Sequence, residues 1–372
     1  MTEIDPLIKN LEEVITVEEL LDLINKKERL NHYIGYEISG LLHLGSAFMS
    51  AMVIKYLQKL NVNCRIFLAD WHSWINEKLG GDLEIIKNIG VKYYEEAFKA
   101  CFKILEIKFE DIEFITGSQL YHCNDSYWLC FVEVAQNVTL SRIKRSLDIL
   151  GRKAGESINF AKLIYPPMQV ADIFALKANI VHAGIDQRKA HVIARQVAEK
   201  IKFLPLKDKK GNKIKPVILH HHLLLGLNKP PKYPLAKEEL KNYLTELKMS
   251  KSKPDSAIFI HDSADEVKNK ILKAFCPPKD ISFNPLIDWV SHLLLPIFGE
   301  VKIKTSQGEK LFKENDELLK NYQEGLIHPL DLKESVYDYI NRLIEPVRKH
   351  FESGLAKNIL IEFKNYLKNK AT

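Results

Sequence analysis

The stretch Tyr33-Ile-Gly-Tyr-Glu-Ile-Ser-Gly-Leu-Leu-His-Leu-Gly-Ser46 decides the fold. Residues 33–37 predict a short strand, and Ser39-Gly40 predicts the turn that ends it. The spacing of the apolar residues that follow predicts a helix: Met49, Val53, Leu57 and Leu60. Residues 64–70 then predict the next strand. Strand, turn, helix and strand in this order indicate a βαβ unit.

The same alternation continues through the first two thirds of the chain. We expect a helix over residues 82–104, a strand at 113–116, a long helical stretch near 126–150 and a strand at 179–182. A helix through Ile193, Val197 and Ile201 and a strand at 216–219 follow. This order predicts an α/β fold with a doubly wound parallel sheet of the Rossmann type. Its ligands bind beyond the carboxyl ends of the strands.

Two capping boxes and a loop divide the chain. Thr16-Val-Glu-Glu19 predicts the start of an early helix, and Ser263-Ala-Asp-Glu266 predicts a second start. Beyond residue 263 the pattern is helical, with a helix near 332–351. We therefore expect a first domain over 1–247 with an insertion at about 119–160, a loop and linker over 248–262, and an α-helical domain over 263–372.

Composition excludes several classes of protein. The chain has 372 residues, 46% of them hydrophobic, which is enough for a sizeable core. Its five cysteines include no CxxC pair, which argues against a zinc ribbon or a disulfide framework. The start of the chain has no signal-like pattern, and no apolar run approaches the roughly 20 residues of a membrane span. We expect a cytoplasmic protein without a membrane partner. The net charge of +6 is compatible with a polyanionic partner.

His43-Leu-Gly-Ser46 lies where the first strand turns into its helix. Backbone N–H groups and the positive helix end favour phosphate binding there, and the imidazole of His43 can stabilise charge that develops on phosphorus. Gly45 leaves room for a nucleotide ring. Taken alone, the motif is more often an ordinary histidine at a helix start.

Lys248-Met-Ser-Lys-Ser252 places two ammonium groups on a loop after the last predicted strand. Such a loop can close over a pyrophosphate leaving group, although a solvated basic linker has the same composition. The doubly wound topology brings this loop and the His43 turn to the same sheet edge. Three adjacent histidines, His220-His-His222, alternate between strand faces, so we expect no protein-bound metal.

Together, these two motifs resemble the HIGH and KMSKS signatures of class I aminoacyl-tRNA synthetases. Ser46 stands where many members carry a second histidine. The resemblance implies that His43, Lys248 and Lys251 are catalytic. It also implies that other residues of the two motifs contact ATP: Gly45, Ser46, Met249, Ser250 and Ser252.

Further segments resemble the tyrosyl-tRNA synthetases of archaea and eukaryotes. They are Tyr33-Ile-Gly-Tyr-Glu37, Tyr165-Pro-Pro-Met-Gln169, Asp172 and Gly184-Ile-Asp-Gln-Arg-Lys189. The resemblance implies that Tyr33 and Asp172 bind the phenolic hydroxyl of tyrosine. Its ammonium end is assigned to Tyr165, Gln169 and Gln187, and Glu37 is also expected to bind tyrosine. A buried acid and a phenol are both paired only by a ligand that brings a hydroxyl. Each of these residues, taken singly, is more often an ordinary core or surface residue.

The same resemblance implies contacts with tRNA. Arg145, Arg188 and Lys189 would read the first base pair, and His328 and Asp331 near the C-terminus would read the anticodon. The second domain would then be an anticodon-binding domain. By analogy with related enzymes, we also expect a homodimer formed through the insertion.

The resemblance implies a tyrosine–tRNA ligase that uses L-tyrosine, ATP with Mg²⁺, and tRNA(Tyr). A tryptophanyl-tRNA synthetase shares the fold and both signatures but needs no pair such as Asp172 and Tyr33. An adenylyltransferase acting on small molecules would not need the C-terminal domain. An RNA-binding paralogue would retain that domain without chemistry. Measuring whether tyrosine supports the exchange of pyrophosphate into ATP separates these alternatives.

Overall fold

The computed structural model describes residues 4–151, 159–234 and 246–371. Within them the central sheet has the strand order β1-β6-β5-β2-β3-β4. All neighbours are parallel except β1, which is antiparallel to β6. The predicted α/β fold with a mostly parallel sheet is confirmed. The strands are β1 Glu13–Ile15, β2 Asn31–Tyr36, β3 Asn63–Leu68, β4 Ile112–Thr116, β5 Ile180–Gly184 and β6 Val217–His221.

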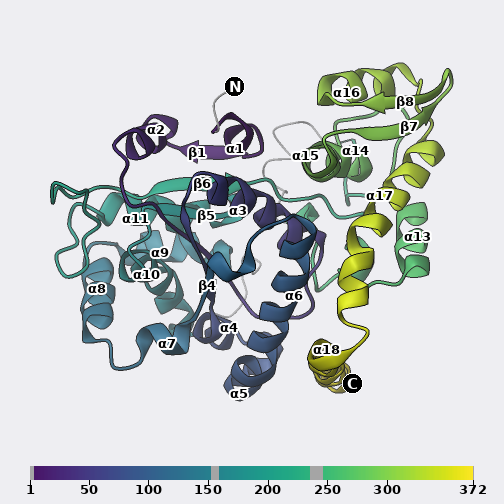
Figure 1. Cartoon of the computed structure of the whole chain (residues 1–372). Coiled ribbons are helices and arrows are strands. Elements are labelled where there is room, and N and C mark those ends of the chain that lie inside the picture. The colour runs from purple at the N-terminus through teal and green to yellow at the C-terminus, as the bar shows by residue number, and fades with distance from the viewer. Residues whose placement is uncertain (1–3, 152–158, 235–245, 372) are drawn as a thin grey trace.

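Helices cover both faces of this sheet (Figure 1). Ile34 and Ile66 pack into one core with α3 and α6, whereas Phe67 and Val181 pack on the other face with α8, α10 and α11. The chain runs from β2 to β3 and β4 and then crosses to β5, so the winding reverses between β2 and β5. The helices of this part are α1 Asp5–Lys9, α2 Val17–Asn25, α3 Ser50–Lys59, α4 Asp70–Ile75, α5 Leu83–Ile85, α6 Val91–Ile104, α7 Gly117–Tyr121, α8 Asp125–Gln136, α9 Leu140–Ser146, α10 Phe160–Ala175 and α11 Arg188–Val197.

Several helices begin at a residue whose side chain caps the helix. Both predicted capping boxes are present, at Thr16 and at Ser263. The long helical stretch predicted near 126–150 is interrupted, because α8 ends at Gln136 and α9 begins at Leu140. Thr139 lies between them in an extended conformation, and its side chain accepts the N–H of Arg142. This cap satisfies a free helix end, so the chain starts a new helix there.

The C-terminal part is helical except for one hairpin. The antiparallel strands β7 Val301–Thr305 and β8 Gly308–Phe312 correct the expectation of an entirely helical domain. Val301, Ile303 and Thr305 are buried and alternate with exposed lysines, which is the period of two that a strand requires. The helices here are α13 Ala264–Lys273, α14 Pro285–Trp289, α15 Leu295–Phe298, α16 Asn315–Glu324, α17 Pro329–His350 and α18 Gly354–Ala371.

The C-terminal helices share a hydrophobic core with the sheet. Leu343 and Val347 of α17 belong to the same buried cluster as Phe98 of α6. Parts of the predicted insertion and of the segment before Lys248, residues 152–158 and 235–245, lie outside the described residues. The domain boundaries therefore stay predictions. In the described part of the chain, no helix is both long and apolar enough to cross a membrane.

Candidate active site

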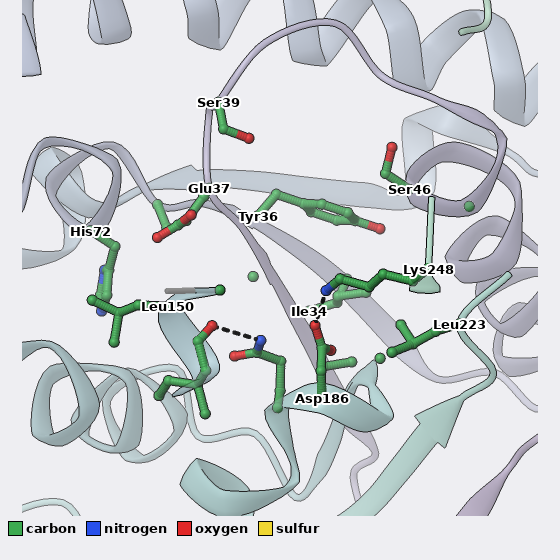
Figure 2. Close-up of a pocket in the computed structure, with 18 of the residues that line it drawn as sticks. Ile34, Tyr36, Glu37, Ser39, Ser46, His72, Leu150, Asp186, Leu223 and Lys248 are labelled. Carbon is green, nitrogen blue, oxygen red and sulfur yellow. Dashed lines mark hydrogen bonds and ion pairs between the residues drawn. The ribbon is translucent and has the colours of Figure 1, made fainter. Parts of the chain in front are cut away.

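One cavity of about 610 Å³ opens where β2, β5 and β6 end (Figure 2). It lies at the reversal of winding between β2 and β5, where the topology predicts a ligand. Every residue predicted to act in catalysis or to bind ATP or tyrosine lines this cavity, although these roles stay predictions. These lining residues are Tyr33, Glu37, His43, Gly45, Ser46, Tyr165, Gln169, Asp172, Gln187, Lys248, Met249, Ser250, Lys251 and Ser252.

A buried carboxyl group lies at one end of the cavity. Asp172 of α10 has no exposed surface, and Tyr33 of β2 is 3% exposed. The Asp172 Oδ1 atom accepts a hydrogen bond from Tyr121 at 3.0 Å, but Oδ2 has no hydrogen-bond partner. Burial raises the pKa of Asp172 well above its usual value and has the same effect on the pKa of Tyr33. An unpaired oxygen that is buried is costly unless a ligand supplies a polar group.

Tyr121 and His72 lie against Asp172, and sequence reasoning missed both. The Tyr121 hydroxyl lies 3.3 Å from His72 Nδ1, and His72 Nε2 lies 3.6 Å from Asp172 Oδ2. The His72 ring meets the Tyr165 ring edge to face, with centroids 4.5 Å apart. Burial lowers the pKa of His72 to about 3, so its imidazole is neutral. Nothing in the local sequence around either residue marks it as a partner of Asp172.

Amide and carboxylate groups lie beside the buried pair. Gln169 Nε2 donates to Gln187 Oε1 at 3.2 Å, and Gln187 Nε2 donates to the carbonyl of Ile149 at 3.1 Å. The Gln169 Oε1 atom is buried without a partner. Glu37 accepts from Asn76 at 2.7 Å and faces the cavity (Figure 2). These acceptors suit an ammonium group, which has donors only.

The His43 turn lies at the opposite end. The Ser46 N–H donates to His43 Nδ1 at 3.3 Å, and Ser46 Oγ accepts from the His43 N–H at 3.0 Å. Because Nδ1 accepts, the proton of the neutral ring lies on Nε2, which is therefore a donor. Burial, followed by the charges of Lys251 and Lys248, lowers the pKa of His43 to about 3. A Cβ added at Gly45 would lie 3.3 Å from the imidazole, so the His43 ring would have to shift slightly to accommodate a larger residue.

The lysine segment 248–252 is anchored to both neighbouring parts of the cavity. Met249 N donates to the Leu224 carbonyl at 2.9 Å, just after β6. Farther on, Leu44 N donates to the Ile258 carbonyl at 3.0 Å, next to His43. The segment therefore spans from the end of β6 to the His43 turn. This arrangement confirms the expectation that the topology brings the two motifs together.

Both lysines of this segment have partners in the structure. Lys248 Nζ forms an ion pair with Asp186 (Figure 2). Burial would raise the pKa of Asp186, but the nearby ammonium of Lys248 outweighs it and the pKa is lowered. Lys251 Nζ donates to Ser39 Oγ at 3.1 Å and to the Tyr94 hydroxyl. An incoming polyphosphate therefore competes with these contacts for the two cations.

The residues predicted for tRNA do not line the cavity and lie in two places. Lys189 Nζ donates to the Arg145 carbonyl at 3.0 Å, so these two are neighbours. Arg188 is half exposed and pairs with Glu13 at 2.9 Å. Near the start of α17, His328 Nδ1 accepts the Leu330 N–H at 3.2 Å, and Asp331 pairs with Lys304 at 3.3 Å. Their predicted contacts with tRNA stay predictions.

The three adjacent histidines have separate partners. His220 lies 2.9 Å from His191, and His221 lies 2.8 Å from His182. His222 Nε2 lies 2.7 Å from Asp288, and its Nδ1 lies 3.2 Å from Glu12. Although burial alone would lower the pKa of His222, these carboxylates raise it to about 10. His222 is therefore an imidazolium between two acids. The absence of a bound metal stays a prediction.

Residues 25–345 match the family described as tRNA synthetases class I (W and Y), and the chain belongs to this family. It is 49% identical over 352 residues to a tyrosine–tRNA ligase of Thermococcus sibiricus, covering 92% of each chain. A tyrosine–tRNA ligase of Pyrococcus furiosus is 49% identical over 354 residues, with 93% of each covered.

Solved structures agree with these sequence relationships. The tyrosyl-tRNA synthetase of Pyrococcus horikoshii complexed with L-tyrosine superposes with a TM-score of 0.92 at 44% identity, covering 98% of this chain and all of that one. The Aeropyrum pernix enzyme superposes with a TM-score of 0.81 at 32% identity, covering 98% of each chain. The class I synthetase fold implied by the motifs is therefore confirmed.

Proposed function

We propose that this protein is a tyrosine–tRNA ligase, which activates L-tyrosine with ATP and transfers the tyrosyl group to tRNA(Tyr). The observation that carries the proposal is the unpaired, buried Oδ2 of Asp172 beside Tyr33, in the same cavity as His43 and the two lysines. A phenolic hydroxyl satisfies this oxygen, whereas phenylalanine leaves it unpaired. The similarity to a tyrosine-complexed synthetase supports the same ligand.

In the first step, a carboxylate oxygen of tyrosine attacks the α-phosphorus of ATP in line. The new P–O bond forms as the bond to pyrophosphate breaks, and the pyrophosphate leaves. His43 donates from Nε2 to the reacting phosphate, while Lys248 and Lys251 move from Asp186 and Ser39 to the leaving group. Mg²⁺ enters as part of the ATP substrate. Positioning and charge stabilisation supply the catalysis, and no covalent enzyme intermediate forms.

In the second step, a hydroxyl of the 3′-terminal adenosine of the tRNA attacks the tyrosyl carbonyl. The bond to AMP breaks, and the adenylate phosphate accepts the hydroxyl proton. We assign Arg145, Arg188 and Lys189 to the acceptor end, because cations bind phosphates and base edges. His328 and Asp331 are assigned to the anticodon, which makes residues 263–372 the anticodon-binding domain and residues 1–247 the catalytic domain.

We infer a homodimer formed through the insertion after β4. Large apolar side chains are exposed on α8 and at the start of α9, including Leu129 at 44%, Val132 at 48% and Leu140 at 58%. Apolar patches of this kind commonly mark protein interfaces. Because its five cysteines are free, the protein suits a reducing compartment, and we propose that it acts in the cytoplasm.

Exchange of labelled pyrophosphate into ATP tests the proposal. We expect exchange with tyrosine and almost none with phenylalanine or tryptophan, because neither places a phenolic hydroxyl against Asp172. Tryptophan that supports exchange as well as tyrosine does would overturn the assignment. Absence of exchange with any amino acid would instead favour a non-catalytic RNA-binding protein.

A further inference from the structure

The C-terminal helix α18 packs against elements that border the cavity, through contacts that the function proposed above does not use. It packs against α6 (Figure 1). The ring of Phe363 is fully buried and stacks on Tyr93 of α6, with centroids 4.7 Å apart. The Tyr93 hydroxyl accepts the backbone N–H of Leu42 at 3.0 Å, next to His43. One layer of side chains therefore separates α18 from the His43 turn.

A second contact joins α18 to the turn formed by residues 77–81. The Tyr366 hydroxyl donates to the Leu79 carbonyl at 2.6 Å. Lys370 covers Gly80, where an added Cβ would overlap the lysine side chain. The turn has an uncommon backbone, with φ of +56° at Glu77 and +46° at Leu79. Such conformations persist only where surrounding contacts hold them, and Tyr366 supplies one of these contacts.

The same turn carries groups that line the cavity. Lys78 Nζ lies 3.4 Å from Glu37 Oε2, and both residues face the cavity. Asn76, just before the turn, donates to the other oxygen of Glu37 at 2.7 Å. Glu77 pairs at 2.8 Å with Lys162, which is 4% exposed and belongs to α10. The turn therefore orients Glu37 and is tied to the helix that carries Asp172.

We propose that Tyr366 is a positioning residue for the tyrosine end of the cavity. Its hydrogen bond to Leu79 holds the 77–81 turn, so that Lys78 keeps the Glu37 carboxylate directed at the ammonium group of the amino acid. The inference rests on the proposed function. Acceptors that are held in place before binding lose less entropy when the ligand arrives. Loss of the hydroxyl should therefore weaken tyrosine binding and leave the phosphate end unchanged.

The test is Tyr366→Phe in the full chain, measured by tyrosine-dependent pyrophosphate exchange. We expect the KM for tyrosine to rise up to about fivefold, the limit that the free energy of one hydrogen bond sets if it is fully coupled to binding, with kcat and the KM for ATP within about twofold of wild type. The matched control is Tyr339→Phe. The Tyr339 hydroxyl also bonds a backbone group, the Lys302 N–H at 3.0 Å, and Tyr339 lies outside the cavity lining. It should lose similar thermal stability without a change in KM.

A double-mutant cycle checks the route through the turn. If Tyr366 acts through Lys78, then Tyr366→Phe should raise the KM for tyrosine much less in a Lys78→Met background than in wild type. An unchanged KM in Tyr366→Phe, an equal rise in Tyr339→Phe, or full additivity with Lys78→Met would each overturn the inference. Failure of the wild-type protein to exchange with tyrosine would instead overturn the proposed function.

Discussion

The cavity end around Asp172, which we propose binds tyrosine, has buried polar groups, whereas the end around His43 and Lys248, which we propose binds phosphate, has them on a backbone turn and an anchored loop. Asp172 has no exposed surface and keeps one oxygen unpaired. The Lys248 side chain is 25% exposed and forms an ion pair with Asp186. A site that selects one amino acid gains from a polar atom that only the right ligand satisfies. A site that stabilises negative charge developing in the transition state needs cations that can change partners.

The largest expected effect belongs to the phosphate end. Lys251→Ala removes a cation that we propose acts on the leaving group, so kcat for exchange should fall by about 10²- to 10³-fold. The KM for tyrosine should change little, because the tyrosine end is intact. Lys253→Ala is the control, since Lys253 is exposed and directly follows the segment 248–252. Equal losses in the two variants would contradict a specific role for Lys251.

A smaller effect is expected at the tyrosine end, and it concerns selectivity. Tyr33→Phe removes one hydroxyl beside Asp172, so kcat/KM for tyrosine should fall about 10-fold or more. The ratio of kcat/KM for phenylalanine to that for tyrosine should therefore rise. Competition between the two amino acids in the exchange assay measures this ratio. Tyr56→Phe on α3, outside the cavity lining, should leave the ratio unchanged. A ratio unaffected by Tyr33→Phe would move recognition of the hydroxyl elsewhere.

Ser46→Ala should have a modest effect. It removes the hydroxyl that accepts the His43 N–H and donates to the His43 carbonyl, each at 3.0 Å. The turn would hold the imidazole less firmly, and kcat should fall about 5-fold, equivalent to about 1 kcal/mol. The KM for tyrosine again serves as the internal control. A rise in that KM without a change in kcat would show that the two ends are not separate.

The smallest expected effect is on stability. Burial raises the pKa of Asp172, so the unfolded chain loses this proton at lower pH than the folded protein does. Folding stability therefore falls as the pH rises above about 4, the usual range for aspartate, and continues to fall until the folded pKa is passed. Asp172→Asn removes this loss. Its Tm should exceed that of wild type at pH 7, and the difference should shrink towards pH 4. The exposed Asp22→Asn is the control; a difference independent of pH would contradict the raised pKa.

Much of the phosphate end was predictable because its motifs are local. His43-Leu-Gly-Ser46 is one turn, and its hydrogen bonds join residues three positions apart. The βαβ order then implied that the lysine segment reaches the same sheet edge. The helix–helix break at Thr139 and the hairpin β7–β8 were misjudged, although their signals, a cap and a period of two, are equally local.

The sequence by itself determined the alternation of strands and helices, the two motifs that we assign to catalysis and the residues that line the cavity, because these depend on spacing along the chain. Only the tertiary structure decided that Tyr121 and His72 surround Asp172, and that α18 supports the 77–81 turn. Tyr366 and Leu79 are separated by 287 positions. Contacts at such a distance depend on how the layers pack, and packing leaves no periodic pattern at either residue.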